Sequence, residues 1–425
     1  MAGETIATAV VASPNHSGLE DLESKKIGEY SVTQILGRAR AIVKERTKDW
    51  EICNLKAEER IPRFHRDEIE VAGVLGRGGF FEVRGIKRIT LRDNEDESET
   101  QGESSLHDFC SEDDAKQGTV QNRKFMQKHC LRHGKDPRYA LKTMQQENYS
   151  DPSAFLNSVV DLVIEFKFLS SVRHPNIIKM RAASAGDLFH PQAFLVLDKI
   201  YCTLTEKIKK WNDKDHSVFH KLFDYHKRRG KHFLAKRLLV AYDIASALAY
   251  LHDINIMFRD LKPNNIGFDV RNDPKLFDFG LAIEFRPDEL QAGTYTLTGD
   301  TGTLQYMAPE VALYKPYNEK ADVYSFGMLL WEICQMEASY PKLSDEEIKR
   351  KVLYMGYRPS VDPEWPASIR RLLQDCFSSS ADRPSMATVC TVLRYEINHL
   401  SGSDVVDGDL LDSARSAASA RYIDP

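Results

Sequence analysis

Several features are scarce in this sequence, and their scarcity excludes whole classes of protein. The 425 residues contain only seven cysteines and no Cys-x-x-Cys pair, which argues against a disulfide framework and against a zinc site. No run approaches the roughly 20 apolar residues that a membrane-spanning helix needs. The most apolar stretch, Phe326 to Cys334, is interrupted by Glu332, and Glu4 stands where a secretory signal carries a basic residue. These absences predict a protein of a reducing, cytoplasmic compartment with no membrane partner.

Charge of one sign is scarce as well. The chain has 58 basic and 63 acidic residues, so the formal net charge is −5 and no overall excess favours nucleic acid as a partner. A hydrophobic content of 42% with 28% charged residues is ordinary for a folded globular protein. The informative features must therefore be local.

The N-terminal 66 residues form a polar extension with one clear element. Ser31 and Gln34 have the spacing of a capping box, and an apolar helical stripe follows: Val32, Ile35, Leu36, Ala39, Ile42 and Val43. This pattern predicts an amphipathic helix near 31–46. The stripe either docks on the folded domain behind it or offers a site to a partner or regulator.

A strand, a glycine turn and a second strand follow from Ile69. Residues 92–118 are then acidic and poor in apolar side chains, so we expect a disordered insertion there. The basic stretch 123–135 is expected to be a solvated loop. Regulatory phosphorylation, for example at Ser111, is the alternative interpretation of these charged runs.

Strand-like and helical patterns separate along the rest of the chain. Strands are expected at 139–144 and 193–197, with a helix between them that ends before His174. From Tyr201 onward the apolar spacing is predominantly helical, and residues 401–425 are expected to form a flexible tail. The order predicts a strand-rich half, a helical half and a cleft between them.

Two short strings carry most of the chemistry. They are Phe258-Arg259-Asp260-Leu261-Lys262-Pro263-Asn264-Asn265 and Asp278-Phe279-Gly280. Asp260 can accept the proton of an attacking hydroxyl, and Lys262 can offset charge on a transferring phosphoryl group. Asn265 and Asp278 offer the oxygen ligands that magnesium prefers. A polar loop with a helix cap does not account for these residue types at these spacings.

Upstream residues complete a phosphoryl-transfer site. Gly76 and Gly78 lie in a turn between two strands, where backbone N–H groups can approach phosphate oxygens closely. Lys142 lies in the following strand, and Glu165 on the next helix can meet it. Such a pair would hold the ammonium over the phosphates, whereas an isolated surface salt bridge would have no such role.

Residues 68–398 resemble a eukaryotic-type protein kinase. The matching segments are Leu75 to Phe80, Ala140-Leu141-Lys142, Glu165, His174-Pro175-Asn176, Arg259 to Lys262, Asp278-Phe279-Gly280, Ala308-Pro309-Glu310, Asp322 to Gly327 and Arg383-Pro384-Ser385. The resemblance implies an α+β, bilobal fold, with a small strand-rich N-lobe (68–198), a larger helical C-lobe (200–398), and ATP with Mg2+ in the cleft.

The resemblance also assigns roles to individual residues. Catalysis would fall to Asp260, Lys262, Lys142 and Glu165, and magnesium binding to Asn265 and Asp278. ATP binding would involve Gly76, Gly78, Val83, Ala140, Lys142, Asp198 and Gly267, with Leu197 at the back of the adenine pocket. Structural roles would fall to a Glu310–Arg383 bridge, to Asp322 beneath the catalytic loop, and to a hydrophobic column of Leu169, Met180, Phe258 and Phe279.

Three positions depart from the family pattern. Phe258 replaces the usual histidine before Arg-Asp, and we expect activity to survive because an aromatic ring can fill the column. Phe81 replaces the third glycine of the loop, and Gly267 replaces a larger apolar residue at the adenine floor. Both bring ATP affinity into question.

The substrate class is readable from two further segments. Lys262 in Leu-Lys-Pro-Asn-Asn and the Gly302-Thr303 pair before Ala308-Pro309-Glu310 resemble the serine/threonine pattern. The segment 322–332 and Cys376 resemble the tyrosine-kinase-like branch, so dual specificity stays open. A pseudokinase scaffold is the competing hypothesis, and a small-molecule kinase is disfavoured by the Ala308-Pro309-Glu310 segment.

Control is expected at the activation loop. Arg259 offers a cation to a loop phosphorylated by an upstream kinase or by autophosphorylation. The candidate hydroxyls are Thr294, Tyr295, Thr296, Thr298 and Thr301, with Thr298 or Thr301 preferred. Protein substrates are the expected partners.

Overall fold

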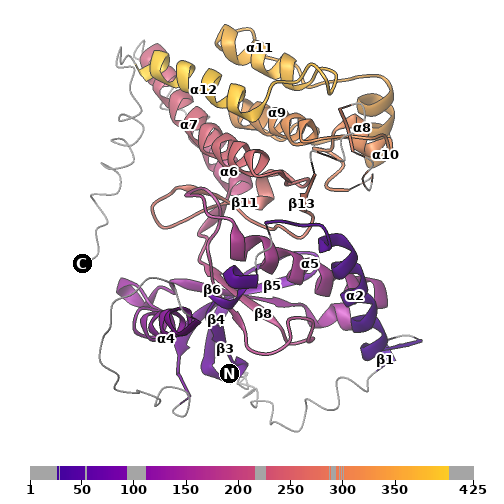
Figure 1. Cartoon of the computed structure of the whole chain (residues 1–425). Helices are drawn as coiled ribbons and strands as arrows, with labels where there is room; N and C mark the ends of the chain where they lie inside the picture. The colour runs from indigo at the N-terminus through magenta and orange to yellow at the C-terminus, as the bar shows by residue number, and fades with distance from the viewer. Residues whose placement is uncertain are drawn as a thin grey trace, which may run out of the picture.

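The computed structural model places a strand-rich half before a helical half, as expected (Figure 1). It describes residues 26–27, 29–52, 55–92, 112–215, 226–286, 288, 293–295, 297, 299 and 301–401. The predicted C-terminal tail beyond Ser401, the candidate site Ser111, and the loop residues Thr296 and Thr298 lie outside these ranges.

The first half is built on a six-stranded sheet in the order β3-β7-β8-β6-β5-β4. Its strands are β3 (Arg63–Phe64), β4 (Ile69–Arg77), β5 (Phe81–Ile89), β6 (Tyr139–Met144), β7 (Met180–Ser184) and β8 (Phe194–Asp198). All neighbours are antiparallel except β3 and β7. Val83 pairs with Lys142, and Ala140 pairs with Leu197. Because side chains alternate along strands, Ala140 and Lys142 share one face of the sheet.

Two predicted boundaries need correction. β3 lies within the predicted extension 1–66 but pairs with β7, so the sheet begins before residue 68. Helix α4 (Glu112–Lys128) begins inside the predicted disordered insertion and extends into the first part of the predicted basic loop 123–135, ending at Lys128. Its Met126 is buried in the cluster that contains Phe64, and Arg123 forms an ion pair with Glu68 at 2.6 Å. These few apolar and ionic contacts stabilise a helix that the polar composition of the segment did not predict.

The N-terminal helix packs on the long helix of the first half. α5 (Pro152–Ser171) begins at the N-cap Asp151 and ends at Val172. α2 (Val32–Thr47) has the predicted capping box, in which Ser31 and Gln34 each accept the other's backbone N–H. The apolar stripe of α2 is buried except for Ile42, which is partly buried, and α2 lies against α5 (Figure 1). In the structure the stripe therefore docks on the folded domain, the first of the two alternatives given above.

The second half is helical, with small two- and three-stranded sheets facing the first half. Its helices are α6 (Leu204–Asp215), α7 (His226–Asp253), α8 (Pro309–Ala312), α9 (Lys320–Gln335), α10 (Asp345–Ile348), α11 (Ala367–Cys376) and α12 (Met386–Ser401). The small strands are β9 (Cys202–Thr203), β10 (Ile256–Met257), β11 (Ile266–Phe268), β12 (Pro274–Leu276) and β13 (Ile283–Glu284). Helix α9 is almost wholly buried, which explains its apolar sequence. Among the described helices, none combines the length and apolarity that a bilayer crossing requires.

The remaining short elements complete the order along the chain. They are the hairpin β1 (Lys26–Ile27) and β2 (Tyr30–Ser31), helix α3 (Leu55–Glu59), and single helical turns at Arg66–Glu68, His133–Lys135, Gln146–Ser150, Pro263–Asn265 and Lys349–Tyr354. The turn at Pro263–Asn265 matters most, because it sets the direction of Asn265 in the catalytic loop.

Candidate active site

The loop between β10 and β11 carries the first chemical string and is anchored from below. Asp322 at the start of α9 accepts the backbone N–H of Phe258 at 2.9 Å and of Arg259 at 2.8 Å. Arg259 has a φ of 68°, a conformation that non-glycine residues adopt rarely. A carboxylate that is 1% exposed thus holds an unfavourable turn in place, as the family resemblance implied for Asp322.

Asp260 sits at the centre of a network of donors. Its Oδ2 accepts Lys262 Nζ at 2.7 Å and Asn265 Nδ2 at 3.0 Å, and its Oδ1 accepts Thr303 Oγ1 at 2.8 Å. Lys262 also donates to Thr303 at 2.8 Å. These contacts fix the orientation of the carboxylate, which is the requirement for a group that receives or aligns a hydroxyl proton.

Thr303 is a site residue that the sequence reasoning did not assign. It follows Gly302, whose φ of 113° suits glycine and whose added Cβ would lie 2.6 Å from the Arg259 carbonyl oxygen. The Gly302-Thr303 pair was used above only to predict the substrate class. Its position shortly before Ala308-Pro309-Glu310 also indicates that Thr303 belongs to the site.

Lys142 joins residues from three separate elements. Its Nζ donates to Glu165 on α5 at 2.5 Å and to Asp278 at 3.2 Å. Burial by itself would lower the pKa of Lys142, but the negative charges of Asp278 and Glu165 outweigh it and raise this pKa. The ammonium therefore stays charged at neutral pH, directed toward the loop that carries Asp278.

The predicted metal ligands suit magnesium by their donor atoms. Asn265 Nδ2 donates to the Asp260 carbonyl at 2.9 Å, which leaves the Asn265 carbonyl oxygen as its cation-binding atom. The Asp278 side chain is 41% exposed, so a carboxylate oxygen is accessible beside Lys142. Within the described residues there is no group of three His, Cys, Asp or Glu that could hold a metal. A two-oxygen protein site fits Mg2+, which keeps waters and takes phosphate oxygens as its other ligands.

The four residues of the predicted hydrophobic column are all buried in one core cluster. Leu169, Met180, Phe258 and Phe279 have at most 3% exposure. The rings of Phe258 and Phe279 meet edge to face at a centroid distance of 5.2 Å. Phe258 therefore packs where the family pattern has histidine, and its ring makes an ordinary aromatic contact.

The glycine turn differs from the expectation in one important respect. The Gly78 N–H donates to the Phe81 carbonyl oxygen at 2.9 Å, so this donor serves the turn itself. The Phe81 side chain is 8% exposed, and its ring centroid lies 4.3 Å from Lys142 Nζ. The ring thus covers the cation that a phosphate must approach.

Replacement of Phe81 by glycine is expected to lower the KM for ATP by roughly twofold to thirtyfold. The ring and the phosphates compete for Lys142, and a desolvated cation–π contact contributes about 0.5–2 kcal/mol. The measurement is the dependence of initial rate on ATP concentration, well below the melting temperature of each variant. Phe81→Leu is the matched control, because leucine fills the space without a π face, and its KM should lie between the two. A KM for Phe81→Gly equal to or above that of the unmodified protein contradicts the competition.

The predicted adenine floor is assembled differently from the family pattern. A Cβ added to Gly267 would lie 2.3 Å from Ile200 Cγ2 and 3.0 Å from Ile200 Cγ1. Ile200 therefore occupies the space of the larger side chain expected at 267. The Asp198 carboxylate is engaged by Arg181 at 2.7 and 2.8 Å, and the Asp198 N–H donates to the Lys179 carbonyl at 3.0 Å, so both groups stabilise the sheet. Sequence reasoning missed Ile200, although a glycine at 267 was itself a sign that a neighbour fills the gap.

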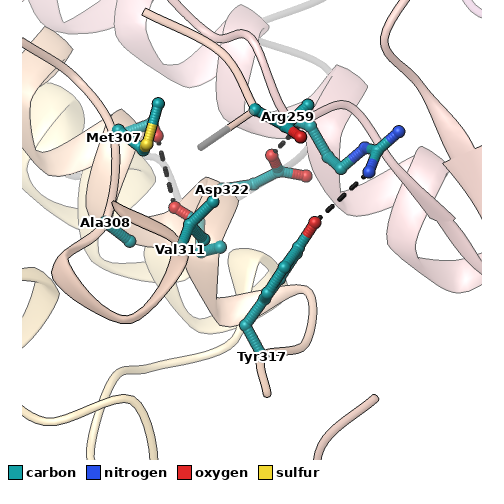
Figure 2. Close-up of a pocket in the computed structure, with 9 residues that line it drawn as sticks. Arg259, Met307, Ala308, Val311, Tyr317 and Asp322 are labelled. Carbon is teal, nitrogen blue, oxygen red and sulfur yellow. Dashed lines mark hydrogen bonds between the residues drawn. The ribbon is translucent and has the colours of Figure 1, made fainter. Parts of the chain in front are cut away.

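Arg259 is engaged by protein groups in a small pocket that Figure 2 shows. Its Nε donates to the Leu281 carbonyl at 2.6 Å, and its Nη1 donates to the Tyr317 hydroxyl at 3.2 Å. Tyr317 is fully buried and exchanges backbone hydrogen bonds with Tyr295 at 2.9 and 3.1 Å. Tyr295 is 5% exposed, which makes it a poor phosphorylation site among the candidate hydroxyls.

The predicted bridge beyond the pocket is present. Arg383 Nη1 and Nη2 donate to the two Glu310 oxygens at 2.5 and 2.9 Å, and the arginine side chain is 2% exposed. This bidentate pair ties the start of α8 to the segment before α12.

Comparison with known families decides the kind of protein. Residues 126–392, more than half of the chain, match the family model described as the protein kinase domain. The chain belongs to the protein kinase family. The predicted α+β bilobal fold is thereby confirmed. The kinase match begins within α4, so β4, β5 and the glycine turn lie outside it, yet they pair in the same sheet as the strand of Lys142.

The matched segment makes up only part of each curated relative. The serine/threonine-protein kinase STY17 of Arabidopsis thaliana is 33% identical over 242 residues, which are 56% of this chain and 38% of STY17. The dual specificity protein kinase shkD of Dictyostelium discoideum is 33% identical over 244 residues, 57% of this chain and 30% of shkD. The serine/threonine-protein kinase CTR1 of Arabidopsis thaliana is 29% identical over 268 residues, 62% of this chain and 29% of CTR1. The chain thus spans about a third of the length of these relatives.

Proposed function

We propose that this kinase transfers the γ-phosphate of ATP to serine and threonine hydroxyls of protein substrates. The observation that carries the proposal is the network in which Lys262, Asn265 and Thr303 all donate to the Asp260 carboxylate. The Lys142–Glu165 pair, with Asp278 beside it, supports the proposal from the other lobe. The names of two relatives, both serine/threonine-protein kinases, agree with this substrate class.

The side chains divide the reaction among themselves. Asp260 aligns the acceptor hydroxyl and receives its proton as the new oxygen–phosphorus bond forms, while the bond from the γ-phosphorus to the bridging oxygen breaks and ADP leaves. Lys262, held between Asp260 and Thr303, places positive charge near the transferring phosphoryl group. Lys142, fixed by Glu165, binds the phosphates on the leaving side. Asn265 and Asp278 would hold Mg2+, which when bound supplies neutralising charge to the phosphate oxygens.

Partners and location belong to the same proposal. Its expected partners are protein substrates, together with an upstream kinase or a second copy acting in autophosphorylation, and its expected location is cytoplasmic. Nucleic acid and membranes are not expected as partners. Dual specificity is the second candidate, favoured by the name of the relative shkD. The pseudokinase alternative finds support in the Phe81 ring that covers Lys142, but the donors around Asp260 favour an active enzyme.

A peptide library incubated with purified protein, radiolabelled ATP and Mg2+ tests the proposal. We expect label on serine and threonine, and we expect excess chelator to reduce incorporation to background because Asn265 and Asp278 alone leave the phosphates unneutralised. Phosphoamino-acid analysis reports the acceptor. Label on tyrosine as well supports dual specificity, and tyrosine as the sole acceptor contradicts the assignment. ATP binding without any incorporation supports the pseudokinase.

A further inference from the structure

The segment that follows α2 contacts Phe168, whose ring lies near that of Phe279 in the active site. The Trp50 and Phe168 rings lie 4.6 Å apart with an interplanar angle of 39°. Phe168 lies on α5, three residues after Glu165, and its ring is 6.3 Å from that of Phe279. Because Phe279 in turn meets Phe258, a continuous series of rings runs from the N-terminal extension to the catalytic loop.

Residues 49–52 also bind Glu284 and Arg286, which lie at the beginning of the activation loop. The Glu284 carboxylate accepts the backbone N–H of Glu51 at 2.9 Å and of Ile52 at 3.1 Å. Glu284 ends β13, and β13 pairs with β10, which leads directly into the catalytic loop. Arg286 adds an ion pair with Asp49 at 3.8 Å. Two successive N–H groups on one carboxylate form charge-assisted bonds, which are stronger than neutral ones.

Helix α2 fixes this segment to the first lobe. Ile35, Leu36, Ala39 and Val43 are each at most 5% exposed in the packing of α2 on α5. Residues 49–52 therefore leave a helix docked on α5 and end on a strand of the other lobe. The segment bridges the element that carries Glu165 and the loop that carries Asp278.

We propose that residues 49–52 act as an interlobe clamp that positions Glu165 and Asp278 around Lys142, which makes Trp50 and Glu284 positioning residues of the kinase. The proposal rests on the proposed function. Without the clamp, α5 and the Asp278 loop lose their shared support, and the Lys142 contacts with Glu165 and Asp278 form only part of the time. Phosphoryl transfer depends on these contacts, and small misplacements far from the chemistry lower its rate strongly.

The test compares Trp50→Ala and Glu284→Ala with two matched variants in the full chain. Glu51→Ala is the control for Glu284, because the backbone N–H of residue 51, and not its exposed side chain, donates to the carboxylate. Trp50→Phe is the conservative rescue, because a smaller ring can still reach Phe168. The readouts are kcat, the KM for a peptide substrate, the KM for ATP and the melting temperature, all at a temperature where every variant is folded.

We expect Trp50→Ala and Glu284→Ala to lower kcat on the order of tenfold to a hundredfold, with the peptide KM unchanged. Glu51→Ala should match the unmodified protein, and Trp50→Phe should recover most of the rate. A purely structural role predicts lower melting temperatures with unchanged kcat in the folded protein, and that result overturns the proposal. If Trp50→Ala does not fold, Glu284→Ala decides alone. Absence of activity in the unmodified protein instead contradicts the proposed function.

Discussion

Asp260→Asn is expected to lower kcat by about 10²–10⁴-fold, the range that general acid–base catalysis contributes. Asparagine has the shape of aspartate but cannot accept the hydroxyl proton. It would also direct an amide NH2 at donors, since Lys262, Asn265 and Thr303 all donate to the Asp260 oxygens. Either the amide or one of these donors must turn away, so the geometry around the acceptor is lost together with the base.

The measurement is the initial rate of phosphate incorporation into the best library peptide at saturating ATP. Asp253→Asn is the matched control, because the same substitution at the exposed C-terminal end of α7 leaves the site untouched. We expect the control to retain full activity. Equal rates for Asp260→Asn and the unmodified protein are incompatible with Asp260 as the residue that receives or aligns the proton.

Gly267→Leu is expected to raise the KM for ATP and to destabilise the fold. The first side-chain atom would already lie 2.3 Å from Ile200 Cγ2, and overpacking of a filled site typically costs about 1–3 kcal/mol. If the overpacking distorts the nucleotide site, the same free energy is lost from ATP binding and the KM for ATP rises by roughly fivefold to a hundredfold. ATP titrations of the rate and thermal melting of both proteins measure the two effects.

The compensating variant makes this second prediction specific. In Ile200→Ala combined with Gly267→Leu, the leucine fills the space that the isoleucine vacates, so the double variant should recover much of the affinity and stability. Because residues in contact do not contribute additively, the coupling should favour the pair by about 0.5–3 kcal/mol. Purely additive effects would show that Ile200 does not take the place of a side chain at 267.

The sequence predicted which of the candidate site residues lie together, because they fall in short, local strings. Asp260, Lys262 and Asn265 fall within six residues, so the local sequence already keeps them close, and distant residues such as Asp322 then fix the conformation of the loop. Lys142 and Glu165 were also predictable, because a strand followed by a helix allows few ways for two such residues to meet. The helix near 31–46 was predictable because a capping box marks its start and apolar residues follow at helical spacing.

The features that were missed depend on contacts between distant segments. Ile200 fills the space at Gly267 from a segment 67 residues earlier in the chain, and the glycine at 267 indicates that the space is filled but not by which residue. Trp50 reads as a lone aromatic residue after a helix until α5 is placed beside it. Helix α4 has an average composition close to that of a loop, and its order depends on a few contacts with Phe64 and Glu68. Tertiary packing overrode composition in each case.

The short strand β3 has a consequence for any attempt to isolate the catalytic region. Ala183 N–H donates to the Pro62 carbonyl at 3.0 Å and Ala185 N–H donates to the Phe64 carbonyl at 2.7 Å. These two bonds cover the outer edge of β7. A fragment that began at residue 68 would leave that edge unpaired, and an open edge is a template on which other chains can aggregate. Residues 62–64 thus protect the edge of β7 from pairing with a strand of another chain.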